Sequence, residues 1–358
     1  MASSDQNILN LMQKAFSVHG AYDLSQNGNP AFTIRIQPVD SAKVRLEIES
    51  GRPSKLLFSE VLSGRDWREA SLSAIDLAVT KTSGLPGIFS SRMAFISDRT
   101  GNTEVYVSDL LMLGVHQVTK DRTHSVRPSI SPDSRIILYT SYFKNGFPDI
   151  YKVNLASGQR EVFASFKGTN TGATYNSMGT SVAMILSGTG NSELYLSDTK
   201  GRNMQRLTRT KGLEADPTWA PDGQRLAFTS DNAGKPQLYE IRRDGTNMKR
   251  IPTNISGYCA EPDWNPVKGN LIAFTVAQAG QFEVAVWDYS TGTSRVVSNG
   301  TGDAIEPTWA ADGRHLIYTE RTSTYQRLVL LDTETGHKGY LHEKAWGNAS
   351  QASCAPRR

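Results

Sequence analysis

The stretch that decides the fold is residues 216–230, which read DPTWAPDGQRLAFTS. Related stretches begin at four other points: RPSISPDSRIILYTS at Arg127, EPDWNPVKGNLIAFTV at Glu261, EPTWAADGRHLIYTE at Glu306, and a degenerate copy, GATYNSMGTSVAMILS, at Gly172. A later part of each unit repeats as well, with Tyr106, Tyr151, Tyr195, Tyr239 and Val284 at steps of 45, 44, 44 and 45 residues. A period of this length is typical of the blades of a β-propeller.

Each unit predicts four short strands with turns between them. In the unit that begins at Asp216, an inner strand is followed by a Pro-Asp-Gly turn and by a second strand in which Leu226 and Phe228 share one face. A glycine-containing loop, a strand centred on Tyr239 and a short fourth strand complete the unit. We interpret the repeated tryptophans as packing between blades and the repeated aspartates as turn formers: Trp219, Trp264 and Trp309, and Asp133, Asp222 and Asp312.

The two ends of the repeat array complement each other. The first unit begins at Arg92 and lacks an inner strand, whereas one period beyond Pro307 lies Ala352, in the C-terminal sequence ASCAP. The spacing therefore predicts that residues 351–356 supply the missing strand and close a ring of six blades over residues 92–356. We expect deletion of residues 350–358 to cost far more stability than the loss of an ordinary tail.

Residues 1–84 lack the period and predict a small N-terminal α/β domain, joined to the propeller by a linker over residues 85–91. The expected elements are a helix over 5–17, strands over 32–36, 44–48 and 55–62, and a second helix that ends at Gly84. Ser63 and Asp66 resemble a capping box at the start of that second helix. The first helix is expected to pack on its domain; the alternative is a detachable segment that binds a partner.

Composition is that of an ordinary water-soluble chain and predicts no membrane span. Hydrophobic residues make up 38%, and no apolar run approaches the roughly 18 residues that a transmembrane helix needs. The formal net charge of +4 is small and evenly spread, so a nucleic-acid partner is not indicated. Residues 1–5 have neither a basic segment nor a following apolar one, so the chain is expected to be cytoplasmic or to begin after a processing or cloning site.

The two cysteines, Cys259 and Cys354, stand far apart and form no CxxC motif. Two unpaired thiols are favoured over one long-range disulfide. Nothing in the sequence indicates an oligomer, and a monomer is expected.

The repeat also predicts a binding site. The residue just before each inner strand is expected to occupy an equivalent position around the central channel, which gives Arg127, Gly172, Asp216, Glu261, Glu306 and Gln351. Three carboxylates against one guanidinium make this mouth acidic although the chain as a whole is basic, so the mouth is expected to attract basic groups. His124 and the loops between second and third strands add a rim typical of a protein interface: Tyr142, Phe143, Asn145, Asn232 and Lys235.

Two other interpretations of the acidic residues remain open. The carboxylates could serve only to cap strand ends by accepting hydrogen bonds from neighbouring backbone amides. Alternatively, Asp216, Glu261 and Glu306 could hold Ca²⁺ in the channel, since calcium prefers oxygen ligands. No other cofactor is expected.

Enzymatic function is not expected. The chain has no GxSxG motif and no hydrolase domain that could carry a catalytic triad. His337 and His342, near Glu343, have a spacing that fits no metal motif and are interpreted as surface residues of the last blade. The best enzymatic alternative is a metal-assisted polysaccharide lyase that would use His124, close to Arg127.

Two segments resemble the TolB family: TSGLPGIF at residues 82–89, which leads into SSRMAF, and DPTWAPDGQRLAFTSDNAGKPQLYEI from Asp216. The resemblance covers about residues 82–356, whereas the N-terminal domain looks shorter than that of TolB. It implies a periplasmic component of the Tol–Pal envelope system that supports envelope integrity and Tol-dependent import. It further implies that the propeller binds the peptidoglycan-associated lipoprotein Pal and that the N-terminal region meets TolA. A propeller that binds another peptide or a glycan is the alternative.

Overall fold

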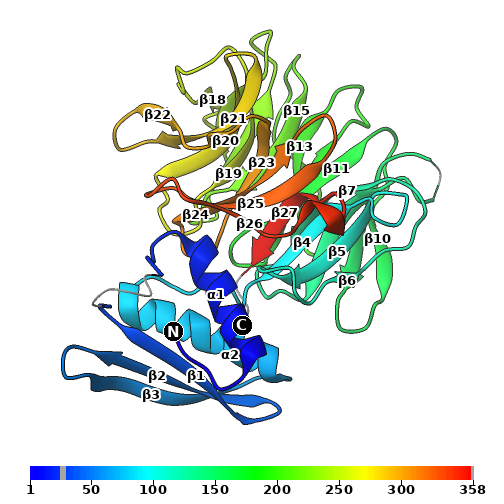
Figure 1. The fold of residues 1–358 in the computed structure, drawn as a ribbon. Helices are drawn as coiled ribbons and strands as arrows, with labels where there is room; N and C mark the ends of the chain where they lie inside the picture. Colours follow the sequence, from blue (N-terminus) through cyan, green and yellow to red (C-terminus); the bar gives the residue numbers. More distant parts are fainter. Residues whose placement is uncertain (25–29, 145, 356–358) are drawn as a thin grey trace.

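A computed structural model describes residues 1–24, 30–144 and 146–355. The N-terminal unit contains α1 (Gln6–His19), β1 (Thr33–Asp40), β2 (Lys43–Ser50), β3 (Lys55–Ser63) and α2 (Trp67–Ser83). The three strands form an antiparallel sheet in the order β1-β2-β3, and α2 packs on it (Figure 1). The apolar residues with helical spacing in α1 are buried: Ile8, Leu11, Met12 and Phe16.

Both helices begin at an aspartate and end at a glycine. Asp5 accepts hydrogen bonds from the backbone amides of Asn7 and Ile8, and Asp66 accepts one from Glu69. The capping box predicted at Ser63 and Asp66 was therefore wrong by three residues. Ser63 is instead the last residue of β3, where it is paired with Lys43.

The rest of the described chain forms six four-stranded antiparallel sheets. The first three in chain order are β4 (Arg92–Ser97), β5 (Glu104–Asp109) and β6 (His116–Gln117) with β27 (Ser350–Ala355); β7 (Ser125–Ile130), β8 (Ile136–Ser141), β9 (Asp149–Asn154) and β10 (Arg160–Ala164); and β11 (Asn170–Tyr175), β12 (Ser181–Leu186), β13 (Glu193–Asp198) and β14 (Gln205–Arg206).

The other three sheets repeat this arrangement. They are β15 (Glu214–Trp219), β16 (Arg225–Ser230), β17 (Gln237–Arg242) and β18 (Lys249–Arg250); β19 (Cys259–Trp264), β20 (Leu271–Gln278), β21 (Gln281–Asp288) and β22 (Thr293–Val296); and β23 (Asp303–Trp309), β24 (His315–Arg321), β25 (Gln326–Asp332) and β26 (Lys338–Tyr340). A short 3₁₀ helix (Lys344–Trp346) precedes β27.

The six inner strands meet around a common centre. Each of β7, β11, β15, β19 and β23 contacts the next, and β27 contacts both β23 and β7 (Figure 1). Within its own sheet β27 pairs with β4, so that Ser353 lies opposite Ala94 and Cys354 opposite Met93. Strands from opposite ends of the chain therefore share one sheet; residue 356 lies outside the described residues.

Burial follows the pattern of a mainly β propeller. The repeated tryptophans are almost fully buried between sheets: Trp219, Trp264 and Trp309. Both cysteines carry free thiols. Among the described residues, no helix combines the length and the apolar character that a membrane crossing demands. His342, interpreted above as a surface residue, is in fact buried. Its Nε2 accepts a hydrogen bond from the backbone amide of Leu328 in the neighbouring strand β25, which holds the ring inside the last sheet.

The N-terminal unit and the propeller share one hydrophobic core. Ile88 and Phe89, in the segment expected to be a linker, are fully buried in that core. The carboxylate of Asp76 in α2 accepts hydrogen bonds from the backbone amides of Phe89 (2.7 Å) and Ser90 (2.8 Å). Gly87 packs so closely on Asp76 that a Cβ atom there would lie 2.2 Å from the aspartate Cβ. The junction is therefore a packed segment whose backbone is held in place against α2.

Candidate functional site

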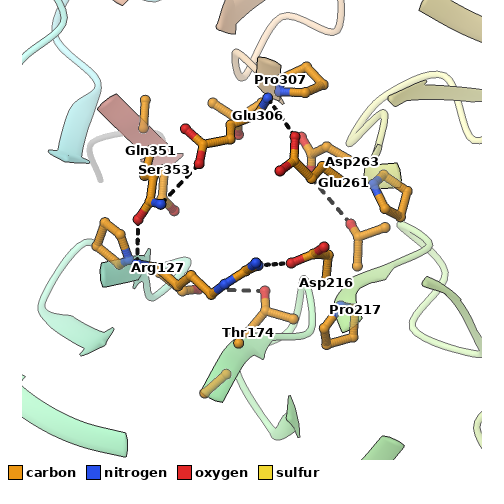
Figure 2. A pocket seen from close by; sticks show the side chains of 18 residues that line it. Arg127, Thr174, Asp216, Pro217, Glu261, Asp263, Glu306, Pro307, Gln351 and Ser353 are labelled. Atoms are coloured by element: carbon orange, nitrogen blue, oxygen red, sulfur yellow. Dashed lines mark hydrogen bonds and ion pairs between the residues drawn. The ribbon is translucent and has the colours of Figure 1, made fainter. Parts of the chain in front are cut away.

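The six residues predicted to surround the channel lie together around one cavity. They lie within the inner strands, not just before them as expected, and line a cavity of about 170 Å³. Figure 2 shows Arg127, Asp216, Glu261, Glu306 and Gln351 around this cavity. All six share an unusual backbone conformation, because every one has a positive φ angle, between 51° and 64°: Arg127, Gly172, Asp216, Glu261, Glu306 and Gln351. We call these six residues the mouth ring.

A β-bulge produces this conformation in each inner strand. Pairing with the second strand is regular on both sides of the ring residue but shifts across it, as between Ala215 and Thr218 or between Ile305 and Thr308. Such a bulge bends the strand and re-aims a side chain. The left-handed conformation costs a residue other than glycine about 1–2 kcal/mol. Five of the six ring positions bear this cost, and Gly172 does not.

Hydrogen bonds connect four of the six mouth-ring residues into a chain. The Gln351 side-chain oxygen accepts a hydrogen bond from the backbone amide of Arg127 (2.7 Å), and its Nε2 donates to Glu306 Oε1 (2.9 Å). The backbone amide of Glu306 in turn donates to Glu261 Oε2 (3.0 Å). These bonds fix the carboxylates in place before any ligand arrives.

An ion pair spans the part of the ring between Arg127 and Asp216. The Arg127 guanidinium contacts the Asp216 carboxylate, although the two residues lie two inner strands apart. Between them lies Gly172, which has no side chain to obstruct the contact. One of the three carboxylates is therefore paired with a cation inside the ring, whereas among the described residues no ion pair within 4.0 Å involves Glu261 or Glu306.

Threonines on the second strands support these two glutamates. Thr275 donates a hydrogen bond to Glu261 (2.7 Å), and Thr319 donates one to Glu306 (3.0 Å). Burial, and then the nearby negative charge of Glu261, raise the pKa of Glu306 above its ordinary value. A cationic group placed between the two glutamates would relieve this cost.

A second ring of residues lies two positions further along each inner strand and lines the same cavity: Ser129, Thr174, Thr218, Asp263, Thr308 and Ser353. Asp263 is the one acid among five hydroxyl residues. Its carboxylate accepts hydrogen bonds from the Trp309 backbone amide (2.7 Å) and the Thr218 hydroxyl (3.2 Å), and burial raises its pKa to about 6. Sequence reasoning missed Asp263, although the aligned repeats set it beside Thr218 and Thr308.

The predicted rim residues lie at the same end of the sheets but outside the cavity. Ser141, which precedes Tyr142, pairs with Ser125 at the start of β7, and Ser230 pairs with Glu214 at the start of β15. These pairings bring five exposed side chains to the mouth end: His124, Tyr142, Phe143, Asn232 and Lys235. Asn145 lies outside the described residues.

The structure gives the other proposed chemistries little to build on. His124 is exposed and lies 3.4 Å from Thr103, and it is not among the residues that line the cavity. Within residues 1–24, 30–144 and 146–355, no three histidine, cysteine or acidic side chains are grouped to hold a metal ion. The Asp216 carboxylate needed for the calcium hypothesis is engaged by Arg127.

Comparison with known proteins gives a consistent result. Residues 79–357 match the family model described as the TolB β-propeller domain. The chain is 31% identical over 231 residues to the Tol–Pal system protein TolB of Bordetella pertussis, an alignment that covers 64% of this chain and 50% of that protein. A TolB of Bordetella bronchiseptica matches equally well, and the chain spans about half the length of the curated relatives it matches.

Solved structures resemble this fold over all or part of its length. TolB from Acinetobacter baumannii superposes with a TM-score of 0.87 at 23% identity, covering 100% of this chain and 96% of that one. An oligogalacturonate lyase in complex with manganese superposes with a TM-score of 0.51 at 18% identity, over 70% of this chain and 73% of the lyase. At these identities the likeness establishes the fold alone.

Proposed function

Because the chain belongs to the TolB β-propeller family, we propose that it binds a protein partner at the mouth ring, and that this partner is a Pal-type peptidoglycan-associated lipoprotein. The observation that carries the proposal is the bulge repeated at all six ring positions. Backbone strain of this kind persists where the surrounding structure over-determines it, and it clusters at binding sites. Here it holds three carboxylates around one cavity, which suits a partner that presents a basic group.

The capping interpretation explains less of this geometry. A carboxylate that served only to bond a backbone amide would not need its own backbone in the left-handed region. Of the three ring carboxylates, Glu261 accepts such an amide bond, from Glu306, whereas Asp216 is paired with Arg127 and Glu306 with Gln351 and Thr319 side chains. The arrangement is therefore better explained by a ligand than by strand capping.

The family suggests the wider setting of this binding. We propose that each four-stranded sheet is one blade of a six-bladed ring over residues 92–356, and that residues 1–84 act as an N-terminal domain joined through residues 85–91. On this proposal the protein works as a periplasmic monomer of the Tol–Pal system, in envelope integrity and Tol-dependent import. Its N-terminal region would then be the part available to TolA.

The test is calorimetric titration of the full chain with the Pal-type lipoprotein domain of the same genome. In the test variant the ring acids become isosteric amides: Asp216→Asn, Glu261→Gln and Glu306→Gln. A matched control neutralises three exposed acids elsewhere: Glu60→Gln, Glu161→Gln and Glu334→Gln. We expect the ring variant to bind at least about tenfold more weakly, roughly 1.4 kcal/mol, while the control keeps the affinity of the natural chain.

Salt dependence gives a second readout. If the mouth attracts a basic group, raising the salt concentration should slow association of the natural chain and have less effect on the ring variant. Unfolding curves of all three proteins verify that the variants are folded. The proposal is wrong if the natural chain does not bind the lipoprotein domain, or if both triple variants bind as the natural chain does.

A further inference from the structure

Exposed aromatic side chains gather beside one part of the mouth ring. Tyr142, Phe143, Phe147 and Phe166 are 37%, 47%, 66% and 48% exposed, fractions unusual for aromatic rings in a folded domain. Phe166 lies in the segment before β11, and the other three lie in the loop after β8. We call these four residues the aromatic crest; residue 145 of the same loop lies outside the described residues and is not part of it.

A partly buried ion pair supports Phe143. The Arg160 guanidinium lies 4.1 Å from the centre of the Phe143 ring. Arg160 in turn contacts the carboxylate of Asp121, whose side chain is almost fully buried, and lies 3.4 Å from the Tyr139 hydroxyl. One face of the Phe143 ring is thus held against a fixed cation, and such fixing lowers the entropy lost when the other face binds.

A single buried side chain connects the two loops of the crest. The Asn170 amide donates hydrogen bonds to the backbone oxygens of Phe166 (2.8 Å) and Pro148 (3.2 Å), and its oxygen accepts one from the Phe166 amide (2.9 Å). Asn170 is fully buried. Because Pro148 follows Phe147 directly, this network fixes Phe147 and Phe166 relative to each other.

The crest adjoins the ring position that has no side chain. Asn170 begins β11, and Gly172, two residues later, is the glycine of the mouth ring. A ligand that covers the crest can therefore continue over Gly172 towards Glu261 and Glu306. The equivalent loops of the next two sheets contain no aromatic residue, since they read SGTGNS (187–192) and DNAGKP (231–236).

We propose that the aromatic crest binds an apolar segment of a polypeptide partner, adjacent to the basic group that the mouth ring attracts. The inference rests on the proposed function, and it deepens it by specifying what the partner must present: leucine, isoleucine, methionine or phenylalanine side chains next to a lysine or arginine. Two features favour a polypeptide over a glycan. Three of the four crest residues are phenylalanines, which offer a sugar no hydrogen bond, and an apolar patch beside a charged centre is typical of protein interfaces.

The test compares two pairs of substitutions in the full chain. Phe147→Ser with Phe166→Ser removes the most exposed crest rings, and Met178→Ser with Val267→Ser removes equally exposed apolar side chains (59% and 57%) from loops at the opposite end of the sheets. Binding is measured to the Pal-type lipoprotein domain and to a fluorescein-labelled octapeptide with one arginine followed by leucine and phenylalanine. Two further peptides replace the arginine by glutamate or the apolar residues by serine.

We expect the crest variant to bind at least about tenfold more weakly, mainly through faster dissociation, and the control pair to bind as the natural chain does. The ring variant should lose the preference for arginine over glutamate, and the crest variant the preference for apolar residues over serine. If the lipoprotein domain binds in a ring-dependent way but is indifferent to the crest, the inference is wrong and the proposed function stands.

If the lipoprotein domain does not bind, the proposed partner is wrong, and binding of the octapeptide then tests the inference about the crest. Crest-dependent binding of the arginine peptide would still support the inference, and absence of binding would overturn it. Crest-dependent binding of chitooligosaccharides in place of peptide would overturn it in favour of a glycan. A dimer in sedimentation that the crest substitutions disperse would overturn it in favour of a second copy of this chain.

Discussion

At the scale of single residues, the site depends on side chains whose charge is costly in the absence of a ligand. Asp263 shows this most clearly, because it is an acid enclosed by hydroxyl residues below the mouth ring. Burial raises the pKa of Asp263 from the ordinary value of 3.8 to about 6 in the folded protein. A carboxyl whose pKa is raised on folding contributes stability below its unfolded pKa and loses that contribution as the pH rises through the folded value.

This argument predicts the behaviour of Asp263→Asn. The amide oxygen can still accept the hydrogen bond from the Trp309 backbone amide, and the side chain cannot ionise, so the variant should escape the loss of stability between about pH 4 and pH 6. Urea unfolding of the variant and of the natural chain at pH 4.5 and pH 7.5 measures this difference in stability. The free energy of unfolding of the variant, relative to the natural chain, should be higher at pH 7.5 than at pH 4.5 by on the order of 1–2 kcal/mol. An unchanged difference at the two values would show that Asp263 ionises without cost.

The sequence could predict where the ring residues lie but not how they interact. A constant period determines equivalent positions, so spacing alone brought Arg127, Asp216, Glu261 and Glu306 to one cavity. The left-handed backbone at those positions depends on pairing with the neighbouring strand, which the local sequence does not encode. The Arg127–Asp216 contact joins two strands across the one that carries Gly172, a relation between three strands that no single repeat contains.

At the scale of elements, the pairing of β27 with β4 joins the two strands that are most separated in sequence among the described strand pairs. Without β27, the inner edge of the first sheet would expose unpaired backbone groups, and β7 and β23 would each lose a neighbour. We expect a chain without residues 350–358 to unfold at a temperature lower by about 10 °C or more. A chain without residues 356–358 alone should unfold within about 2 °C of the full chain. Thermal unfolding followed by circular dichroism tests this, and equal effects of the two deletions would show that β27 is dispensable.

The second helix shows why local signals can mislead. The sequence contains two overlapping capping signals, from Ser63 to Asp66 and from Asp66 to Glu69. The first would end β3 earlier, but Ser63 is held in the strand by its pairing with Lys43. The helix therefore begins at the second signal, where Asp66 accepts the hydrogen bond from Glu69. Non-local strand pairing decided between two local patterns of similar strength.

At the scale of the whole molecule, the N-terminal unit packs on the first and last sheets of the propeller, at the end away from the mouth. The carbonyl oxygen of His19, at the end of α1, lies 2.6 Å from His315 Nε2, and His315 Nδ1 lies 2.6 Å from Asp312. His19 is itself fully buried with both ring nitrogens unpaired. Burial, and then the nearby His315, lower the pKa of His19 to about 4, whereas Asp312 and Asp332 act in the opposite direction.

A buried histidine of this kind makes the contact between the two units sensitive to acid. In the unfolded chain His19 takes up a proton near pH 6.5, but in the folded protein it resists protonation until about pH 4. His19 should therefore lower stability as the pH falls through that window. We expect His19→Leu to reduce the difference in unfolding free energy between pH 7.5 and pH 5 by on the order of 2 kcal/mol. His337→Gln, which changes an exposed histidine near α1, serves as the control, and an equal effect of both substitutions would contradict the assignment to His19.

The pairing of β27 with β4 also determines how far the chain can fold while it is being synthesised. Residues 92–117 leave the ribosome long before residues 350–355, and their sheet cannot be completed until those later residues follow. At ordinary rates of translation the delay is roughly 10 to 50 s. During that interval the nascent chain carries an unfinished sheet edge, which is the kind of surface that chaperones bind and that seeds aggregation. We conclude that the synthesis of residues 350–355 determines when the first sheet can be completed, so that termination of translation before these residues would release chains whose first sheet lacks its inner strand.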